Sequence, residues 1–405
     1  MEIPYSYKNE DYAYITLPPL KAFCHENGLN TGGTRNMLIQ RIEDFASKNS
    51  KNENIVKDWL DSVLKIGIKT CIIDKINLGD YSDNMNIKRL IEERHVSCPK
   101  QHVCSQVGKK QLQLVDYKIE QDNGLVKNIS FKFIIGLLKA KTVHDDKGVK
   151  INYPVFVDVD FETKFMISRA KSASLIYRIE NDLAIIPGNN TSPEKILAEA
   201  REEVVTTLGL ILDSKKNRVE ETKKTIFGIL KKFTNTPVPI QSLIDKNEKD
   251  IGSFIVTIFN NIGVHPDKEL IEEAKEDMRI MIEKYSSITY PDKKIFISDR
   301  DAYPIQFVTL DNEFTRIQEA SAIEEPLQRK RAFFDSKKVV FKDKKCDKLC
   351  LCYKMVPDRY YNEKNFVAKI TIVDGAFCIK ISKFVKEGDI QNVLSGIIQM
   401  YNVQE

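Results

Sequence analysis

Hydrophobic and polar positions change their rhythm along the chain, and each rhythm predicts a different kind of element. Between residues 17 and 45, apolar side chains recur every three or four positions on both sides of the glycine-containing stretch 28–33, which predicts two short amphipathic helices. Residues 47–54 are polar and aperiodic, so we expect a linker there. Residues 59–68 and 85–94 return to a helical spacing and predict two further helices.

From residue 111 onward, apolar side chains alternate with polar ones, as they do in strands that bury one face. The alternating runs lie at 112–115, 129–135, 155–159, 165–169 and 175–179. Polar residues typical of turns separate these runs. The pattern predicts an antiparallel meander of four or five strands.

The middle of the chain is helical in its spacing. Ser192 followed by Pro193 indicates a helix start, because serine caps a first turn and proline suits the first helical position. We expect helices over 193–232, with a break near Gly209 or Ser214, and then over about 240–261 and 266–285.

Strand patterns reappear in the last third of the chain. Residues 338–341 and 349–355 are candidate strands, and 366–383 has the pattern of a hairpin. Asp374-Gly375 at its centre is the dipeptide that a type I′ turn favours, because both central residues need a positive φ. A closing helix is expected over about 387–401.

Together these patterns predict an α+β protein. A small N-terminal helix–loop–helix unit precedes a larger body with antiparallel β-meanders at each end and a helical middle segment. The expected parts are 1–48 for the N-terminal unit, 49–110 for a linker and helical segment, 111–190 for the first meander, 191–290 for the helical region, and 291–405 for a C-terminal α+β region with the hairpin 366–383 and a terminal helix.

Composition narrows the functional classes only slightly. The 405 residues are 42% hydrophobic and 30% charged, which is too apolar for a disordered chain, and the net charge of +4 does not by itself require a nucleic-acid or membrane partner. The N-terminus lacks the features of a signal peptide, and the longest apolar stretches, such as 131–138, are far shorter than the ~20 residues of a membrane span. Eight scattered cysteines are not typical of a secreted disulfide scaffold. We therefore expect no membrane partner and a cytoplasmic location, or the nucleoid or nucleus.

The segment 20–42, LKAFCHENGLNTGGTRNMLIQRI, has a further feature besides its two apolar helix faces. Gly28-Leu29 follows the first helix, Gly33-Thr34 precedes the second, and Arg35 and Arg41 lie on the second. Over about residues 11–48 this arrangement resembles the SAP motif, a helix–extended loop–helix unit of many chromatin-associated and DNA-repair proteins. The resemblance implies contact with the DNA backbone and a preference for AT-rich DNA through groove shape.

The residues themselves are compatible with phosphate binding. Gly28 can end the first helix in a left-handed conformation, Gly33 lets a partner approach the backbone, and Thr34 is a natural N-cap whose helix start, beside Arg35, suits an anion. Residues 1–50, however, carry five basic against six acidic side chains, a net of −1, so binding by this unit alone should be weak and salt-sensitive. The alternative is a structural two-helix cap or a protein-interaction module.

Two later segments are locally basic. Residues 94–118 carry five basic side chains against one acidic, a net of +4, and 329–348 carry nine against three, a net of +6, with Phe333, Phe334 and Phe341 interleaved. Basic residues with aromatics suit a nucleic-acid surface, although solvated lysine-rich loops would look the same. The candidate DNA-binding residues are Lys21, Gly33, Thr34, Arg35, Arg41, Lys109, Lys110, Arg329, Lys330, Arg331, Lys337 and Lys338.

Four residues of the types that bind zinc lie within the first basic segment, 94–118. His95, Cys98, His102 and Cys104 are spaced by three, four and two, which does not match a paired zinc knuckle. We expect ordinary thiols and no metal. The four residues are kept as the candidate ligands of a zinc alternative.

The sequence VDVDFETK at 157–164 raises the possibility of a metal-dependent nuclease. Asp158, Asp160, Glu162 and Lys164 could hold Mg²⁺ and polarise a water molecule. The same residues fall where one strand must turn into the next, and we favour this turn interpretation. No phosphate-binding loop, nucleophile elbow, HExxH pair or dinucleotide motif is present. We expect no cofactor, with Mg²⁺ only under the nuclease alternative.

The sequence thus favours a non-enzymatic DNA-binding accessory protein. Its expected partners are double-stranded DNA, bound without sequence specificity or with an AT-rich preference, and a second protein or another copy of the chain. A phage-related or antiviral-defence component or a chromosome-associated factor would fit. Two alternatives remain: a nuclease with its site at 158–164, and an assembly subunit without DNA contact that uses the acidic helix 267–284 for protein contacts.

Overall fold

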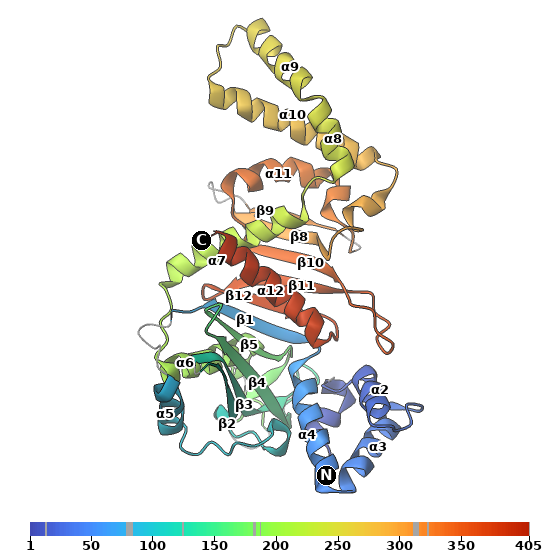
Figure 1. Ribbon diagram of the computed structural model, residues 1–405, viewed down its shortest axis with the longest axis vertical. Helices are drawn as coiled ribbons and strands as arrows, with labels where there is room; N and C mark the ends of the chain where they lie inside the picture. The colour runs from blue at the N-terminus through green and yellow to red at the C-terminus, as the bar shows by residue number, and fades with distance from the viewer. Residues whose placement is uncertain are drawn as a thin grey trace. The chain divides into compact units, whose positions relative to one another are not determined.

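The computed structural model describes residues 1–404 except 13, 78–83, 124, 181–183, 187, 311–315 and 322–323. The fold class is α+β, as predicted. The chain forms two compact units (Figure 1). Unit 1 comprises residues 1–219, 355–366 and 373–398, and unit 2 comprises 220–354, 367–372 and 399–405.

Unit 1 begins with helices that form because their apolar residues recur at helical spacing. They are α1 (Tyr5–Lys8), α2 (Leu17–Glu26), α3 (Arg35–Ser47) and α4 (Ser50–Lys65). Gly28 ends α2 with φ +67°, and Thr34 caps α3 by accepting a hydrogen bond from the Met37 amide at 3.4 Å. Both features agree with the sequence-based expectation.

The prediction of a linker at 47–54 is wrong, because most of this stretch is helical. The stretch contains the end of α3 and the first turn of α4, because Asn49 caps α4 by accepting from the Asn52 amide at 2.8 Å. The Asn52 side chain in turn donates to the Phe45 carbonyl at 3.0 Å. Polar asparagines that looked like linker residues therefore form a tight helix–helix junction.

The sheet of unit 1 is antiparallel in all its described pairings, and it contains the predicted meander. Its strands are β1 (Lys69–Lys75), β2 (Gln113–Asp122), β3 (Leu125–Lys139), β4 (Val149–Asp160), β5 (Phe165–Lys171), β6 (Ile176–Arg178), β7 (Asn190–Thr191) and β12 (Ala376–Ile381). The order is β7-β6-β3-β4-β5-β1-β12, and β2 also pairs with β3. Strand β6 returns to β3 instead of following β5, and β1 lies where the sequence showed no strand pattern.

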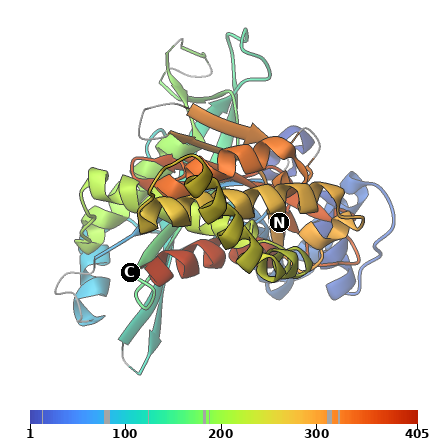
Figure 2. The ribbon, with the colours of Figure 1, turned by 90° about the horizontal axis from the view of Figure 1, so that it is seen from above.

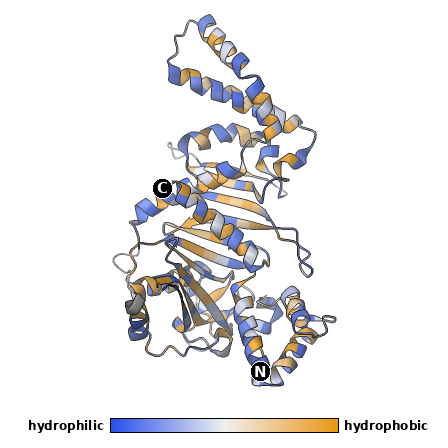
Figure 3. Cartoon of the chain, viewed as in Figure 1, coloured by the Kyte–Doolittle hydropathy of each residue, from blue (hydrophilic) through white to orange (hydrophobic). Residues whose placement is uncertain are grey.

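Helices cover both faces of this sheet near β3 and β4. On one face, Phe133 and Val157 pack with α6 (Pro193–Leu208) and the described part of α5 (Asn84–Arg94). On the other face, Ile134 and Phe156 pack in one cluster with apolar residues of α2, α3 and α4. Burial on both faces explains the nearly continuous apolar run of β3, and Figure 3 shows hydrophobic residues along these strands.

The break expected within 193–232 is confirmed. Helix α6 ends at Gly209, whose φ is +62°, and α7 (Lys215–Phe233) follows. The turn of the predicted C-terminal hairpin is confirmed too, since Asp374 and Gly375 both have positive φ. The closing helix is α12 (Glu387–Gln404).

Unit 2 has its own antiparallel strands and helices. The strands β8 (Ala302–Leu310), β9 (Arg316–Ala320), β10 (Lys348–Lys354) and β11 (Asn365–Val373) follow the order β11-β10-β8-β9. The helices are α8 (Val238–Lys246), α9 (Glu248–Asn261), α10 (Lys268–Thr289) and α11 (Arg331–Asp343). Short 3-10 turns in the two units are η1 (Glu10–Tyr12), η2 (Val103–Ser105), η3 (Lys293–Phe296) and η4 (Leu327–Arg329). Figure 2 shows α9 and α10 side by side, in agreement with their direct contacts.

Two expectations for unit 2 are corrected. Residues 338–341 were expected in a strand but lie in α11, because Phe333, Phe334, Lys337 and Val340 are buried at helical spacing. The single helix expected at 240–261 is two helices, separated at Asn247, whose backbone leaves the helical region and whose side chain donates to the Leu243 carbonyl at 2.7 Å. Among the described residues, no helix is long and apolar enough to span a membrane.

Candidate nucleic-acid interface

The loop between α2 and α3 is held in an exposed, defined conformation. Asn30 accepts a hydrogen bond from the Gly32 amide at 2.8 Å through its side-chain oxygen. Arg41 donates to the Asn30 carbonyl at 3.0 Å and also to the Gly32 carbonyl. Gly32 and Gly33 are exposed, and Gly33 has a φ of +108°, which favours glycine. At Gly32 and Gly33 the loop therefore presents backbone to solvent.

The start of α3 continues this exposed surface. Thr34 and Asn36 are exposed, and the amides of Arg35 and Asn36 in the first turn have no acceptor within the helix. The helix dipole adds partial positive charge at this end. An anion can thus accept hydrogen bonds from backbone groups that the helix itself leaves unused.

The two arginines of this region, Arg35 and Arg41, hold the local backbone through hydrogen bonds and also place positive charge beside the loop. Arg35 is half-buried, and its Nε donates to the Ile15 carbonyl at 3.0 Å. Burial lowers the pKa of Arg35, while the charge of Glu10 opposes that shift. Arg35 and Arg41 therefore shape the loop and leave their charge beside it, whereas Lys21 is a half-buried lysine on α2.

An aromatic cluster fixes α2 and α3 on α4. The Phe23 ring lies 5.9 Å from the Phe45 ring in an edge-to-face arrangement and 4.8 Å from the Trp59 ring. Such pairs contribute beyond their buried area. The loop is consequently carried by a three-helix core.

Comparison with known families bears on this geometry. Residues 11–46 match the SAP domain. The match confirms the resemblance seen over residues 11–48 and supports nucleic-acid binding by this part of the chain. No curated protein matches the chain.

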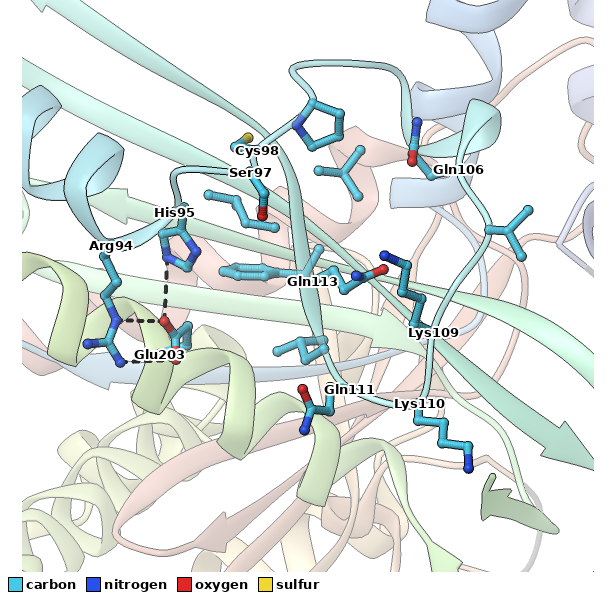
Figure 4. Close-up of a pocket in the computed structure, with 16 residues that line it drawn as sticks. Arg94, His95, Ser97, Cys98, Gln106, Lys109, Lys110, Gln111, Gln113 and Glu203 are labelled. Carbon is cyan, nitrogen blue, oxygen red and sulfur yellow. Dashed lines mark hydrogen bonds and ion pairs between the residues drawn. The ribbon is translucent and has the colours of Figure 1, made fainter. Parts of the chain in front are cut away.

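A pocket of about 710 Å³ lies in unit 1 beside the first basic segment (Figure 4). Lys109 and Lys110, both exposed, line it together with residues of the loop and the start of β2. Lys110 donates to the Glu180 carbonyl. The wall from α5 and α6 contains Arg94, which donates from Nε to Glu203 at 2.7 Å.

The four candidate zinc ligands divide between two places. His95 lines the pocket with Cys98, and its Nε2 lies 3.2 Å from Thr207 Oγ1. His102 lies 3.4 Å from Asp61 on α4, and Cys104 is buried. In the part of the chain that the structure describes, no group of three or more histidine, cysteine or acidic side chains could hold a metal ion.

The second basic segment lies in unit 2 and differs from its expected form. Phe333 and Phe334 are buried in the core instead of facing solvent. Lys337 is also buried and forms an ion pair with Glu283. Of the other candidates here, Arg331 is exposed. Arg329 and Lys330 pair with Glu325, at 3.4 and 2.8 Å, and Lys338 pairs with Asp277 at 2.7 Å.

The residues of the nuclease alternative have structural partners. Asp158 accepts from Arg169 at 3.1 Å and from Ser130 at 2.6 Å; burial would raise its pKa, but Lys65 and Arg169 hold the pKa below its usual range. Asp160 accepts from the amides of Glu162 and Thr163, at 2.8 and 2.9 Å, and so closes the turn into β5. Lys164 has a φ of +60° in that turn. The geometry favours the turn interpretation.

Sequence reasoning missed the residues that attach α4, on which the SAP domain packs, to the sheet. Asp61 on α4 is buried and accepts from Lys132 on β3 at 3.0 Å. It also accepts from the amides of Val103 and Cys104 at 3.4 Å each. An aspartate among the apolar positions of an amphipathic helix was the available signal, since a buried carboxylate requires partners.

Proposed function

We propose that the chain is a DNA-binding accessory protein whose SAP domain contacts the phosphate backbone of duplex DNA. The exposed loop 30–34 and the first turn of α3 carry the proposal. The amides of Arg35 and Asn36, which have no acceptor within the helix, form a donor pair suited to a phosphate, and the capping Thr34 fixes its geometry. Contacts of this kind position a protein on DNA without reading bases.

The binding we propose is weak, salt-dependent and either non-specific or AT-preferring. The net charge of −1 over residues 1–50 leaves few cations to neutralise phosphates. With two or three phosphates neutralised, the logarithm of affinity should fall with the logarithm of salt concentration with a slope of about −2 to −3. Any AT preference would come from groove shape, because backbone amides do not distinguish base edges.

Further contacts would raise the affinity of the intact chain. Lys109 and Lys110 of unit 1 are the exposed lysines we propose as additional basic surface. A chromosome-associated or defence complex, in the cytoplasm or nucleoid, is the setting that we propose for such an accessory protein. A protein partner in it would add avidity to a weak DNA contact.

The sharpest test is a substitution that repels phosphate without harming the helix. Asn36→Asp in the intact chain places a carboxylate in the first turn of α3, where the helix dipole favours it but a DNA phosphate does not. We expect affinity for a duplex to fall about fivefold, equivalent to about 1 kcal/mol, with no loss of thermal stability. Fluorescence anisotropy with a labelled AT-rich duplex measures the affinity.

A matched control is the same change on the neighbouring helix. Asn54 is exposed on α4, and along the chain it follows the C-terminal end of α3, a helix about 20 Å long that begins after Thr34. Asn54→Asp should leave duplex affinity unchanged. Equal affinity of the wild type and Asn36→Asp, or equal losses for Asn36→Asp and Asn54→Asp, would contradict the assigned contact.

Point substitution is preferable to removal of the SAP domain. A chain starting near residue 55 would begin inside α4 and would lose the aromatic partners of Trp59. It would also expose Ile134 and Phe156 on the covered face of the sheet. Loss of DNA binding by such a fragment could reflect unfolding, whereas Asn36→Asp isolates the contact.

A further inference from the structure

The pocket beside residues 94–113 has the size of a small-molecule site. Its volume of about 710 Å³ lies within the roughly 300–1,000 Å³ of ligand pockets. All its lining residues belong to unit 1, and none belongs to the SAP domain. The pocket is therefore a feature separate from the DNA contact proposed above.

The charge of the pocket favours an anion. Arg94 and Glu203 neutralise each other through two hydrogen bonds, at 2.7 and 3.3 Å. Lys109 has no carboxylate partner among the described residues, and Lys110 bonds a neutral carbonyl. Two positive charges thus remain at the rim. Lys109 can donate to a phosphate oxygen inside the pocket, whereas Lys110 points away from the space (Figure 4) and adds positive charge beside it.

The remaining lining combines amides with apolar side chains. Gln111 and Gln113 line the pocket, and each amide can donate and accept at the same time. Figure 4 shows Gln113 and Lys109 pointing toward the middle of the space. Leu112 and Pro99 supply apolar surface beside these polar groups.

His95 adds a neutral polar group to the opposite wall. Burial lowers its pKa, although Glu203 opposes the shift and Arg94 supports it. The imidazole is held by Thr207 on α6 at 3.2 Å. A neutral ring across the pocket from the amides can hydrogen-bond an uncharged heterocycle without repelling or attracting it as an ion.

We propose that this pocket binds a nucleotide, with the phosphate at Lys109 and the base edge at Gln111 and Gln113. Glutamine amides match the donor–acceptor edge of adenine, and the apolar side chains suit the face of a base. A free mononucleotide and one nucleotide of a single strand share this chemistry. Binding of one nucleotide of a single-stranded DNA would rest on the proposed DNA-binding function. Binding of a free mononucleotide does not rest on it.

Isothermal titration of the intact chain tests the proposal. The probes are deoxyadenosine monophosphate, deoxyadenosine, inorganic phosphate and a 5′-phosphorylated single-stranded decamer of deoxyadenosine. We expect the monophosphate to bind more tightly than deoxyadenosine or inorganic phosphate, because only it uses both ends of the pocket. Lys109→Gln should weaken monophosphate binding about tenfold, and Gln113→Leu about fivefold.

The control is Lys150→Gln, which removes an exposed lysine of β4 that does not line the pocket. It should bind the monophosphate as the wild type does, and circular dichroism verifies that all three variants are folded. Tighter binding of the decamer than of the monophosphate assigns the site to a strand, and the reverse assigns it to a free nucleotide.

Three results would overturn the proposal: saturable binding of neither nucleotide probe, equal affinity for inorganic phosphate and the monophosphate, or folded Lys109→Gln and Gln113→Leu variants that bind like the wild type. Monophosphate binding uses no SAP residue. Its outcome therefore stands whether or not Asn36→Asp weakens duplex binding.

Discussion

The two basic segments, 94–118 in unit 1 and 329–348 in unit 2, look alike in sequence and differ in structure. The second carries the larger net charge, +6 against +4. Yet six of its nine basic side chains, at 329, 330, 337, 338, 342 and 345, form ion pairs with acidic residues of unit 2. In the first segment, three of the five basic side chains are also paired, at 94, 100 and 118, while Lys109 and Lys110 form no ion pair among the described residues and lie at the rim of a pocket.

This difference shows that local charge counts do not predict accessible charge. The partners of Lys337 and Lys338 are carboxylates of α10, which lies more than 50 residues earlier in the chain. The acidic face of α10, which the sequence suggested as a protein-contact surface, is thus partly used within unit 2. The segment 94–118, although it carries the smaller net charge, is the better candidate for an anion site because its two lysines without an ion pair among the described residues, Lys109 and Lys110, both line a pocket.

The largest effect that tests this comparison concerns the buried pair of Lys337 and Glu283. Lys337→Met leaves Glu283, only 3% exposed, without its cation, and should lower the free energy of unfolding by about 3–5 kcal/mol. Urea denaturation of the intact chain measures it. The double variant Lys337→Met/Glu283→Met should recover most of the loss, since neither charge remains buried. A loss below about 1 kcal/mol for Lys337→Met would show that the pair is not buried as described.

A smaller effect is expected at Lys338, which is 43% exposed in its side chain and pairs with Asp277. The hydrogen bond to Asp277 raises the pKa of Lys338, but water screens an exposed pair. Lys338→Gln should therefore cost less than about 1 kcal/mol and leave duplex affinity unchanged. Fluorescence anisotropy with the labelled duplex compares the duplex affinity of Lys338→Gln with that of Lys110→Gln. An equal loss of affinity in both variants would mean that the paired segment contacts DNA after all.

The smallest effect concerns pH and His95 in the first segment. Burial lowers its pKa, so the folded state resists a proton that the unfolded chain binds below about pH 6.5. Stability should thus be lost as pH falls through this value, by less than about 1 kcal/mol because Glu203 offsets part of the shift. His95→Gln should lose less stability than the wild type between pH 7 and pH 5. Equal losses in both proteins would assign the pH dependence to other groups.

Much of the fold could be predicted from local patterns. The SAP domain, the first meander, the break at Gly209 and the turn at Asp374 each have a signal within a few residues. The prediction of a strand at 338–341 was wrong because it gave more weight to the β-branched valines than to the helical spacing of the buried residues. These are Phe333, Phe334, Lys337 and Val340. There the burial pattern of the whole helix determines the structure, and propensity does not.

The candidate sites were less predictable, because they depend on contacts between distant segments. The exposed loop at Gly33 followed from its motif. The structural roles of Arg35 and Arg41 did not, since each bonds a backbone carbonyl that no sequence pattern specifies. Gln113 at the start of β2, and Gln111 just before it, join a pocket only because this segment passes near α5 and α6. Glutamines at the start of a strand carry no signal of such a site by themselves.

The packing of the SAP domain on the covered face of the sheet couples two properties that a tethered module would keep separate. Loop 30–34 rests on α2 and α3, which share a core cluster with Ile134 and Phe156 of the sheet. A ligand that binds only the folded loop therefore stabilises that core as well, by about 2.7 kcal/mol at a free concentration 100 times its dissociation constant. Conversely, a core substitution remote from the loop, such as one at Phe156, would weaken ligand binding by depleting the folded population. Affinity and folding in unit 1 are thus thermodynamically linked.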